Sequence, residues 1–287
     1  MRGYNLMRSI FIRGSIVAMA YPFAYPLSAA PQHQQVPLTA GSPQTSTETP
    51  PSRRIVIHTN SKPVSGAYPL YDLLSISTQS GSISVSVTPH AASSEDPADQ
   101  PTSLQLNAVS GSVYASLDAA LDVPAREYIT SVSSQGGSVS GTYPLGTSTS
   151  VSSRSGSLNG IELVVMPSSN TTSKPRQLRT AAHSGSQSVR IVDDSFFWTL
   201  QEKEKEVWWD GMVSRHESQS GSLDVQYPSS WQGMIDVDAG SGSVSITGRG
   251  VEIIREYNGR YLARKGDGSG GKVYVKARSG SVNLRFG

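Results

Sequence analysis

The tripeptide Ser-Gly-Ser recurs along this chain of 287 residues and constrains the fold more than any other feature. Seven copies are identical, and an eighth reads Gly-Gly-Ser. Self-similarity at a period of about 20–50 residues is typical of architectures built from stacked repeats. A single unit of this size cannot bury its own apolar side chains, so the copies are expected to stack. The central glycines, which we expect to be structural corners, are Gly81, Gly111, Gly137, Gly156, Gly185, Gly221, Gly242 and Gly280.

Small and apolar residues occupy fixed positions on both sides of these glycines. The residue after glycine is always serine, and the residue two after it is apolar in all copies but one. The residue five before glycine is apolar in six copies. Such alternation with a period of two is typical of a strand with one buried face. The residue three before glycine, which we expect to point into a crowded interior, is always small: Thr78, Ala108, Ser134, Ser153, Ala182, Ser218, Ala239 and Ala277.

Each copy is therefore expected to form a strand, a corner and a second strand. Glycine provides a positive φ or a tight corner at no steric cost. The same corner in every copy favours an all-β, single-domain parallel β-solenoid of about eight Ser-Gly-Ser repeats. The alternative is a β-sandwich of successive hairpins, although the commonest hairpin turns contain Asn-Gly or Asp-Gly rather than Ser-Gly-Ser.

The repeats are unevenly spaced, so loops must interrupt the stack. Neighbouring glycines are 19 residues apart at Gly137 and Gly156 but 38 apart at Gly242 and Gly280. The last strand, Val282–Phe286, is predicted to leave an open edge through which copies of the chain self-associate. The longest loops are expected at Pro89–Thr102, Pro167–Arg179, Asp193–Asp210 and Ile254–Gly271.

The composition of the chain narrows the classes of function. Charged residues make up 16% of the chain, against about 25% in an ordinary domain, which suits a thin repeat fold with a hydroxyl-rich surface. The net charge of +2 gives no electrostatic case for binding nucleic acid. The chain has no cysteine, which excludes disulfides, thiolate zinc sites and iron–sulfur clusters.

Residues 1–30 have the features of a targeting segment. Three arginines precede the apolar stretch Ile16–Leu27, and small residues follow, which is the order of a secretory signal. A Pro/Ser/Thr-rich linker is expected at 31–53 and the repeat domain at 54–287. An arginine-bearing start without acidic residues also fits an organelle presequence, so a mitochondrial or cytoplasmic location stays open beside a secreted or cell-surface one.

No motif for catalysis, cofactor binding or metal binding stands out. The glycine-rich run that ends at Lys272 fits the start of a phosphate-binding loop, but Val273 stands where that loop needs Ser or Thr. The five histidines lack the spacing of metal ligands. Asp193 and Asp194 are adjacent, but neighbouring strand residues point to opposite faces, so their carboxylates would not converge for glycoside cleavage. We therefore predict no enzyme, no cofactor and no metal site.

An aromatic and charged insertion at 193–213 is the main departure from the repeat. Its tryptophans, Trp198, Trp208 and Trp209, would form a ligand platform if they are exposed. The alternative is that the aromatic residues pack the insertion onto the repeat domain. The insertion is either a hairpin with a charged tip or a short helix capped by Ser195.

Three residues break the apolar columns in the two copies that flank the insertion: Thr180, Gln187 and His216. His216 is expected either to be a buried, hydrogen-bonded histidine or to mark the place where the stack opens. A specific function is expected first at this break. In the loop before it, Asn170 begins an Asn-Thr-Thr sequon, where a glycan could be attached if the chain is secreted.

The C-terminal repeats carry the most specific pattern. Tyr227-Pro-Ser-Ser-Trp231-Gln-Gly233 precedes Val237-Asp-Ala-Gly-Ser-Gly-Ser-Val244-Ser-Ile-Thr-Gly248-Arg-Gly-Val251, and Ala277-Arg-Ser-Gly-Ser-Val282-Asn-Leu284 follows. Together with the Ser-Gly-Ser columns, this run resembles the adhesin-like β-solenoid domain of unknown function found in bacteria and fungi. The resemblance covers roughly Ile55–Gly287 and is strongest to the fungal members.

The resemblance implies a non-catalytic, adhesin-like structural or binding module, secreted or at the cell surface. Its partner would be a surface glycan, a matrix or a protein, and the family brings no catalytic residues. Two alternatives remain. A carbohydrate-active β-helix enzyme needs a cluster of carboxylates in one groove. An intracellular scaffold follows if the N-terminal segment is not a signal.

Overall fold

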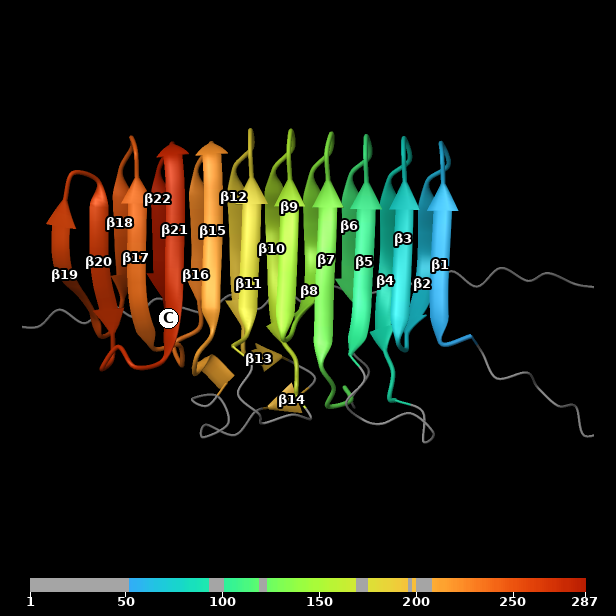
Figure 1. Cartoon of the computed structure of the whole chain (residues 1–287), viewed down its shortest axis with the longest axis horizontal. Coiled ribbons are helices and arrows are strands. Elements are labelled where there is room, and N and C mark those ends of the chain that lie inside the picture. The colour runs from blue at the N-terminus through green and yellow to red at the C-terminus, as the bar shows by residue number, and fades with distance from the viewer. Residues whose placement is uncertain (1–51, 93–100, 119–122, 169–174, 196–197, 200–207) are drawn as a thin grey trace, which may run out of the picture. The chain divides into compact units, whose positions relative to one another are not determined.

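The computed structural model describes an all-β arrangement in which two large sheets face each other across one apolar core (Figure 1). The predicted targeting segment, nearly all of the linker and Asn170 lie outside the described residues. In the described part, no helix has the length and apolar character needed to cross a membrane. The described residues are 52–92, 101–118, 123–168, 175–195, 198–199 and 208–287.

Successive strands of the repeats alternate between the two sheets, so that each repeat adds one strand to each sheet. The larger sheet has eleven strands, in the order β1 (Arg54–Thr59), β3 (Leu73–Thr78), β5 (Thr102–Ala108), β7 (Tyr128–Ser134), β9 (Ser148–Ser153), β11 (Gln177–Ala182), β15 (Val213–Ser220), β21 (Gly271–Ser279), β17 (Gly233–Ala239), β20 (Arg260–Lys265) and β19 (Val251–Tyr257). The smaller sheet has nine strands, in the order β18 (Val244–Gly248), β22 (Val282–Phe286), β16 (Leu223–Tyr227), β12 (Gln187–Val192), β10 (Leu158–Val165), β8 (Val139–Leu145), β6 (Val113–Leu117), β4 (Ile83–Pro89) and β2 (Val64–Leu70).

Neighbouring strands of both sheets are parallel, apart from the two pairs that β20 makes with β17 and β19. A sandwich of successive hairpins needs antiparallel neighbours, so the pairing favours the solenoid-like arrangement over the sandwich. The first two strands, β1 in the larger sheet and β2 in the smaller one, are joined without a Ser-Gly-Ser corner. They therefore lie outside the eight repeats expected from the sequence. In the insertion, β13 (Asp194–Ser195) and β14 (Trp198–Thr199) form a small antiparallel pair.

The corner glycines are required mainly by the close approach of backbone. A Cβ atom on Gly156 would lie 2.3 Å from the carbonyl oxygen of Gly137, and the corresponding distance at all eight corners is 2.0 to 2.6 Å. Each corner therefore stacks on the backbone of its neighbour and leaves no room for a side chain. A positive φ is the other expected reason for glycine. Among the eight corner glycines it is found only at Gly221, Gly242 and Gly280.

The small residues three before each corner glycine are buried, as predicted, and the hydroxyls of Ser134 and Ser153 connect successive corners. Ser134 Oγ donates to the carbonyl oxygen of Gly111 at 2.8 Å and accepts from the N–H of Gly137 at 2.9 Å. Ser153 Oγ makes the same two contacts with Gly137 and Gly156, at 2.8 and 3.0 Å. Ser134 and Ser153 therefore each satisfy backbone groups of two corners at once, whereas Ser218 Oγ donates to the carbonyl oxygen of its own corner glycine, Gly221.

The last two strands lie inside the sheets rather than at an edge. β21 is paired with both β15 and β17, and β22 with both β16 and β18. The prediction of an open edge at Val282–Phe286 is therefore wrong, because both sides of that strand are occupied. Figure 1 shows β21, in red, between the orange strands on either side of it.

This order arises because the chain leaves a gap and later returns to fill it. After β17 and β18, the chain forms the antiparallel strands β19 and β20 and then turns at 266–270 into β21. The expectation of a loop at Ile254–Gly271 is wrong, because most of that segment forms the end of β19 and all of β20.

Candidate ligand-binding face

The outer face of the larger sheet presents rows of polar side chains. Because the strands are parallel and in register, residues at the same distance from the corner glycine line up across the sheet. The row four before glycine reads, from β3 to β17, Ser77, Asn107, Ser133, Ser152, Ala181, Glu217, Lys276 and Asp238. The row two before glycine reads Gln79, Val109, Gln135, Arg154, His183, Gln219, Arg278 and Gly240.

One part of this face is basic. Within six residues of the corner glycine, exposed basic side chains gather on the outer face of four neighbouring repeats, those of β9, β11, β15 and β21. The only acid that these strands direct to the same face is Glu217. We name this group the basic strip, and its members are Arg154, Arg179, His183, Arg215, Lys276 and Arg278.

Two members of the basic strip, Arg179 and Arg215, have side-chain partners within the described part of the chain. Arg179 Nη2 donates to Glu217 Oε2 at 2.8 Å, and the guanidinium of Arg215 lies 5.5 Å from the centroid of the Tyr274 ring. The side chains of Arg154, Lys276 and Arg278 make no hydrogen bond or ion pair with any described residue. Their charges therefore face solvent and are available to a ligand.

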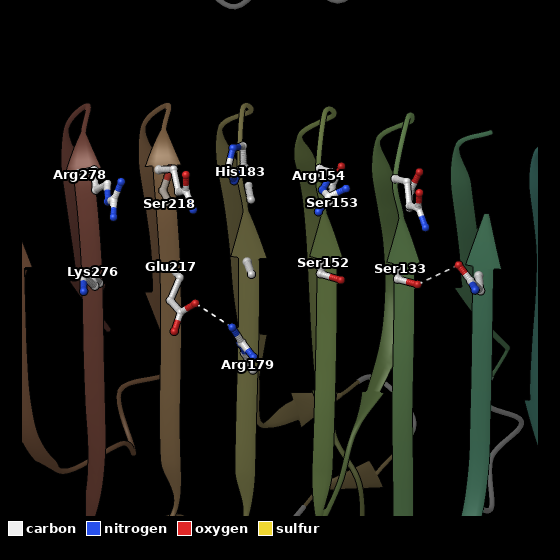
Figure 2. A pocket seen from close by; sticks show the side chains of 16 residues that line it. Ser133, Ser152, Ser153, Arg154, Arg179, His183, Glu217, Ser218, Lys276 and Arg278 are labelled. Atoms are coloured by element: carbon white, nitrogen blue, oxygen red, sulfur yellow. Dashed lines mark hydrogen bonds and ion pairs between the residues drawn. The ribbon is translucent and has the colours of Figure 1, made fainter. Parts of the chain in front are cut away.

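The basic strip borders a shallow, open depression of about 630 Å³ that continues onto the hydroxyl rows of β5 to β9 (Figure 2). Ser133 and Ser152 stand in its floor, and Ser133 Oγ donates to Asn107 Oδ1 at 3.0 Å. Figure 2 shows Arg154, His183 and Arg278 near the corner end of the strands. Hydroxyl and amide groups hydrogen-bond polyols, and guanidinium groups bind carboxylates, so both chemistries meet in one hollow.

The carboxylate of Asp193 is used in a structural contact at the end of the sheets away from the corners. Ser230 Oγ donates to it, and Trp209 Nε1 donates to Ser230 Oγ at 3.0 Å. The side chain of Asp194 lies outside the described part. Among the described residues, no three acids, cysteines or histidines group in a way that could hold a metal. Asp193 therefore supports Trp209 through Ser230.

Trp208 and Trp209 do not form an exposed platform. They are 5% and 1% exposed and belong to the apolar core. Trp208 Nε1 donates to the carbonyl oxygen of Met166 at 3.3 Å, and the guanidinium of Arg176 lies 4.7 Å from the centroid of the Trp208 ring. The platform prediction is wrong for these two residues, and the alternative that they pack onto the repeat domain is confirmed. The indole of Trp198 lies outside the described side chains.

The three residues that break the apolar columns meet in one buried hydrogen-bonded chain. His216 Nδ1 lies 2.7 Å from Thr180 Oγ1, and Nε2 lies 2.8 Å from Tyr227 Oη. Thr180 Oγ1 donates to Gln187 Oε1 at 2.8 Å, and Gln187 Nε2 donates to the carbonyl oxygen of Glu217. Because the hydroxyl hydrogen of Thr180 is used by Gln187, His216 Nδ1–H donates to Thr180 and Nε2 accepts from Tyr227. The prediction of a buried, hydrogen-bonded histidine is confirmed.

This chain of hydrogen bonds is closed to solvent. Thr180, Gln187 and His216 are all buried, and burial lowers the pKa of His216 to about 3. The imidazole is therefore neutral at neutral pH. The residues that break the apolar columns fill the core at this point with polar side chains that are hydrogen-bonded to one another. A soluble ligand reaches the outer face of the same strands but not this network.

The basic strip was not predicted from the sequence, although a signal for it exists. The row two before glycine is uncharged in the first three copies and carries Arg154, His183 and Arg278 in later ones. Recognising a cluster requires knowing that Arg278 lies close to the others, and that depends on the position of β21 beside β15.

Comparison with models of protein families, with curated proteins and with solved structures found no match to this chain. The resemblance to the adhesin-like domain therefore remains an expectation from the sequence, and the function must be argued from the face itself.

Proposed function

We propose that this chain is a non-catalytic, adhesin-like binding module, built as a parallel β-solenoid of about eight Ser-Gly-Ser repeats and working outside the cell or at its surface. Its ligand is a surface or matrix glycan that lies on the outer face of the larger sheet. The observation that carries this proposal is the set of aligned rows in which hydroxyl, amide and basic side chains alternate over β3 to β21.

The geometry of the rows suits a polymer. Neighbouring strands are about 4.8 Å apart, so a row offers a polar group at a spacing close to the length of one sugar ring. The side chains stand on sheet strands, which hold them more firmly than loops would, so little freedom is lost on binding. Weak contacts repeated along one chain add up to useful retention.

A polysaccharide panel tests this function on the full chain. We expect retention on at least one glycan without the release of new reducing ends. Ser133→Glu with Ser152→Glu changes the centre of the face and should abolish retention. Ser188→Glu, on the exposed face of the smaller sheet, is the matched control and should leave it intact.

Two results would overturn the proposal. Retention on none of the polysaccharides would remove the glycan-binding function. Release of reducing ends that disappears in Asp193→Asn would instead favour a carbohydrate-active enzyme. N-terminal sequencing of the mature protein separates the extracellular module from an intracellular scaffold, because a secreted chain should have lost about its first 30 residues.

A further inference from the structure

We infer that the basic strip makes this face selective for an acidic polysaccharide whose sugars carry carboxylates. This inference rests on the proposed function and names the class of glycan. It starts from Arg154 and Arg278, two arginines of the strip that have no partner among the described residues and no acid beside them in their row. Exposed guanidinium groups with no acid to neutralise them attract anions from solution.

The positions of these cations match a chain that lies across the strands. Arg154 and His183 directly follow β9 and β11 and stand in one row with Arg278 of β21, and Gln219 of β15 lies between the last two. That row spans three strand spacings, or about 14 Å. A polymer following it meets a basic side chain or an amide at every strand. Arginine binds carboxylates through two parallel hydrogen bonds, which adds orientation to attraction.

The surroundings of the strip favour a moderately charged sugar polymer over other polyanions. Glu217 stands within the strip and would repel a densely sulfated chain. The hydroxyl rows beside it, including Ser133 and Ser152, suit the neutral hydroxyls of sugars. Single-stranded nucleic acid binds on several stacked aromatic rings, and the outer face of these four strands offers one, Tyr274, with the guanidinium of Arg215 at 5.5 Å from its centroid.

The test measures binding of the full chain to an oligogalacturonate of fixed length, with neutral dextran for comparison. We expect oligogalacturonate to bind and dextran to bind on the order of tenfold more weakly or not at all. Arg154→Gln with Arg278→Gln should weaken oligogalacturonate binding on the order of tenfold and leave dextran unchanged. Arg154→Lys with Arg278→Lys keeps the charge and should lose only part of the affinity.

A matched control keeps the net charge of the double variant. Arg190→Gln with Arg249→Gln removes two exposed arginines that lie off the strip and should bind like the wild type. Circular dichroism should show the same spectrum for all variants, since every changed side chain is exposed.

Each other outcome overturns the inference. Unchanged binding by Arg154→Gln with Arg278→Gln would show that the strip is not used. Tighter binding of dextran sulfate or single-stranded DNA than of oligogalacturonate at about 0.15 M salt would show a general polyanion surface. Retention on neutral glycans alone would leave the proposed function standing and remove this inference, whereas no retention on any glycan removes both.

Discussion

At the scale of single residues, the glycines and serines at the corners set how closely the repeats stack. The carbonyl oxygen of one corner lies where the next corner would carry a side chain, so neither can move without shifting its neighbour. Adding a side chain to a rigid backbone contact of this kind costs more free energy of folding than a change in φ and ψ preference alone. The residue type is thus decided by the adjacent repeat rather than by its own loop.

Gly156→Ala should lower the free energy of unfolding by about 2–3 kcal/mol, because its Cβ would overlap the backbone of Gly137. Gly160 is the matched control. It has a φ of +57° with nothing within 4 Å of its added Cβ, and asparagine tolerates that conformation. Gly160→Asn should therefore cost about 1 kcal/mol or less. Chemical denaturation measures both, and equal losses would contradict the stacking argument.

His216→Leu should destabilise the protein by more than its change in volume suggests. It leaves the buried hydroxyl hydrogen of Tyr227 without its acceptor, and an unsatisfied buried group costs about 1–3 kcal/mol. Thr180 loses one donor but keeps its bond to Gln187. Replacing the whole network by apolar residues should recover most of this loss. If denaturation shows no recovery, the network contributes more than its hydrogen bonds. The fourfold variant is Thr180→Val, Gln187→Leu, His216→Leu and Tyr227→Phe.

His216 should also make the fold sensitive to mild acid. Its pKa is about 6.5 in the unfolded chain and about 3 in the folded one, so the unfolded state binds the proton first. Stability is then lost as the pH falls from about 6.5 toward 3, by about 1.4 kcal/mol per pH unit. Between about pH 7 and 5, the wild type should lose about 2 kcal/mol more than the fourfold variant. Parallel pH profiles of unfolding would contradict this.

At the scale of elements, a row of alternating charge accompanies the unusual strand order. Glu217 of β15, Lys276 of β21, Asp238 of β17 and Arg260 of β20 follow one another across the sheet. If β15 paired directly with β17, Glu217 would stand beside Asp238, and like charges on adjacent strands repel. With β21 between them, every neighbouring pair in the row has opposite charge.

Lys276→Glu should therefore destabilise the region around β21 by about 1–2 kcal/mol, because it places a third acid in line with two others. Adding Glu217→Lys, Asp238→Lys and Arg260→Glu reverses all four charges of the row and should restore most of the stability. Lys272→Glu is the control, because its neighbours in the row are Val213 and Met234. Thermal unfolding at low salt gives the comparison, and equal effects of the two lysine variants would exclude the charge row as a cause.

At the scale of the whole molecule, the sequence predicts the strand pairs but not their full order. Alternation around each glycine is local, so strands and buried faces follow from period two. The order in which the repeats stack depends on which residues of an apolar column become neighbours. Val237 and Val275 are identical in type, so either would fit beside His216. The basic strip could not be predicted for the same reason. Arg278 lies near Arg154 only because β21 pairs with β15. Whether the tryptophans are exposed or buried could not be predicted either, because it depends on how the whole core packs.

The repeat formed by β21 and β22 lies between the repeats of β15/β16 and β17/β18 and should couple the stability of these two neighbours. Leu284 is fully buried between β16 and β18, and Leu284→Ala should cost about 2–5 kcal/mol. Hydrogen exchange should then speed up together in β17 to β22, while β3 to β10 stay protected. Leu104→Ala, equally buried in β5, is the control and should leave β17 to β22 protected. Uniform loss of protection in both variants would contradict this coupling.

The position of β21 and β22 also has a consequence for biosynthesis. A ribosome completes β17 to β20 before it makes residues 271–287, yet β21 lies between β15 and β17 in the finished larger sheet, and β22 lies between β16 and β18 in the smaller one. Earlier repeats can add one at a time to a growing stack as they emerge. The final four strands of the larger sheet cannot, because β17 has no native neighbour on one side until β21 has been made. Emergence of residues 271–287 from the ribosome is therefore the step at which this part of the protein closes.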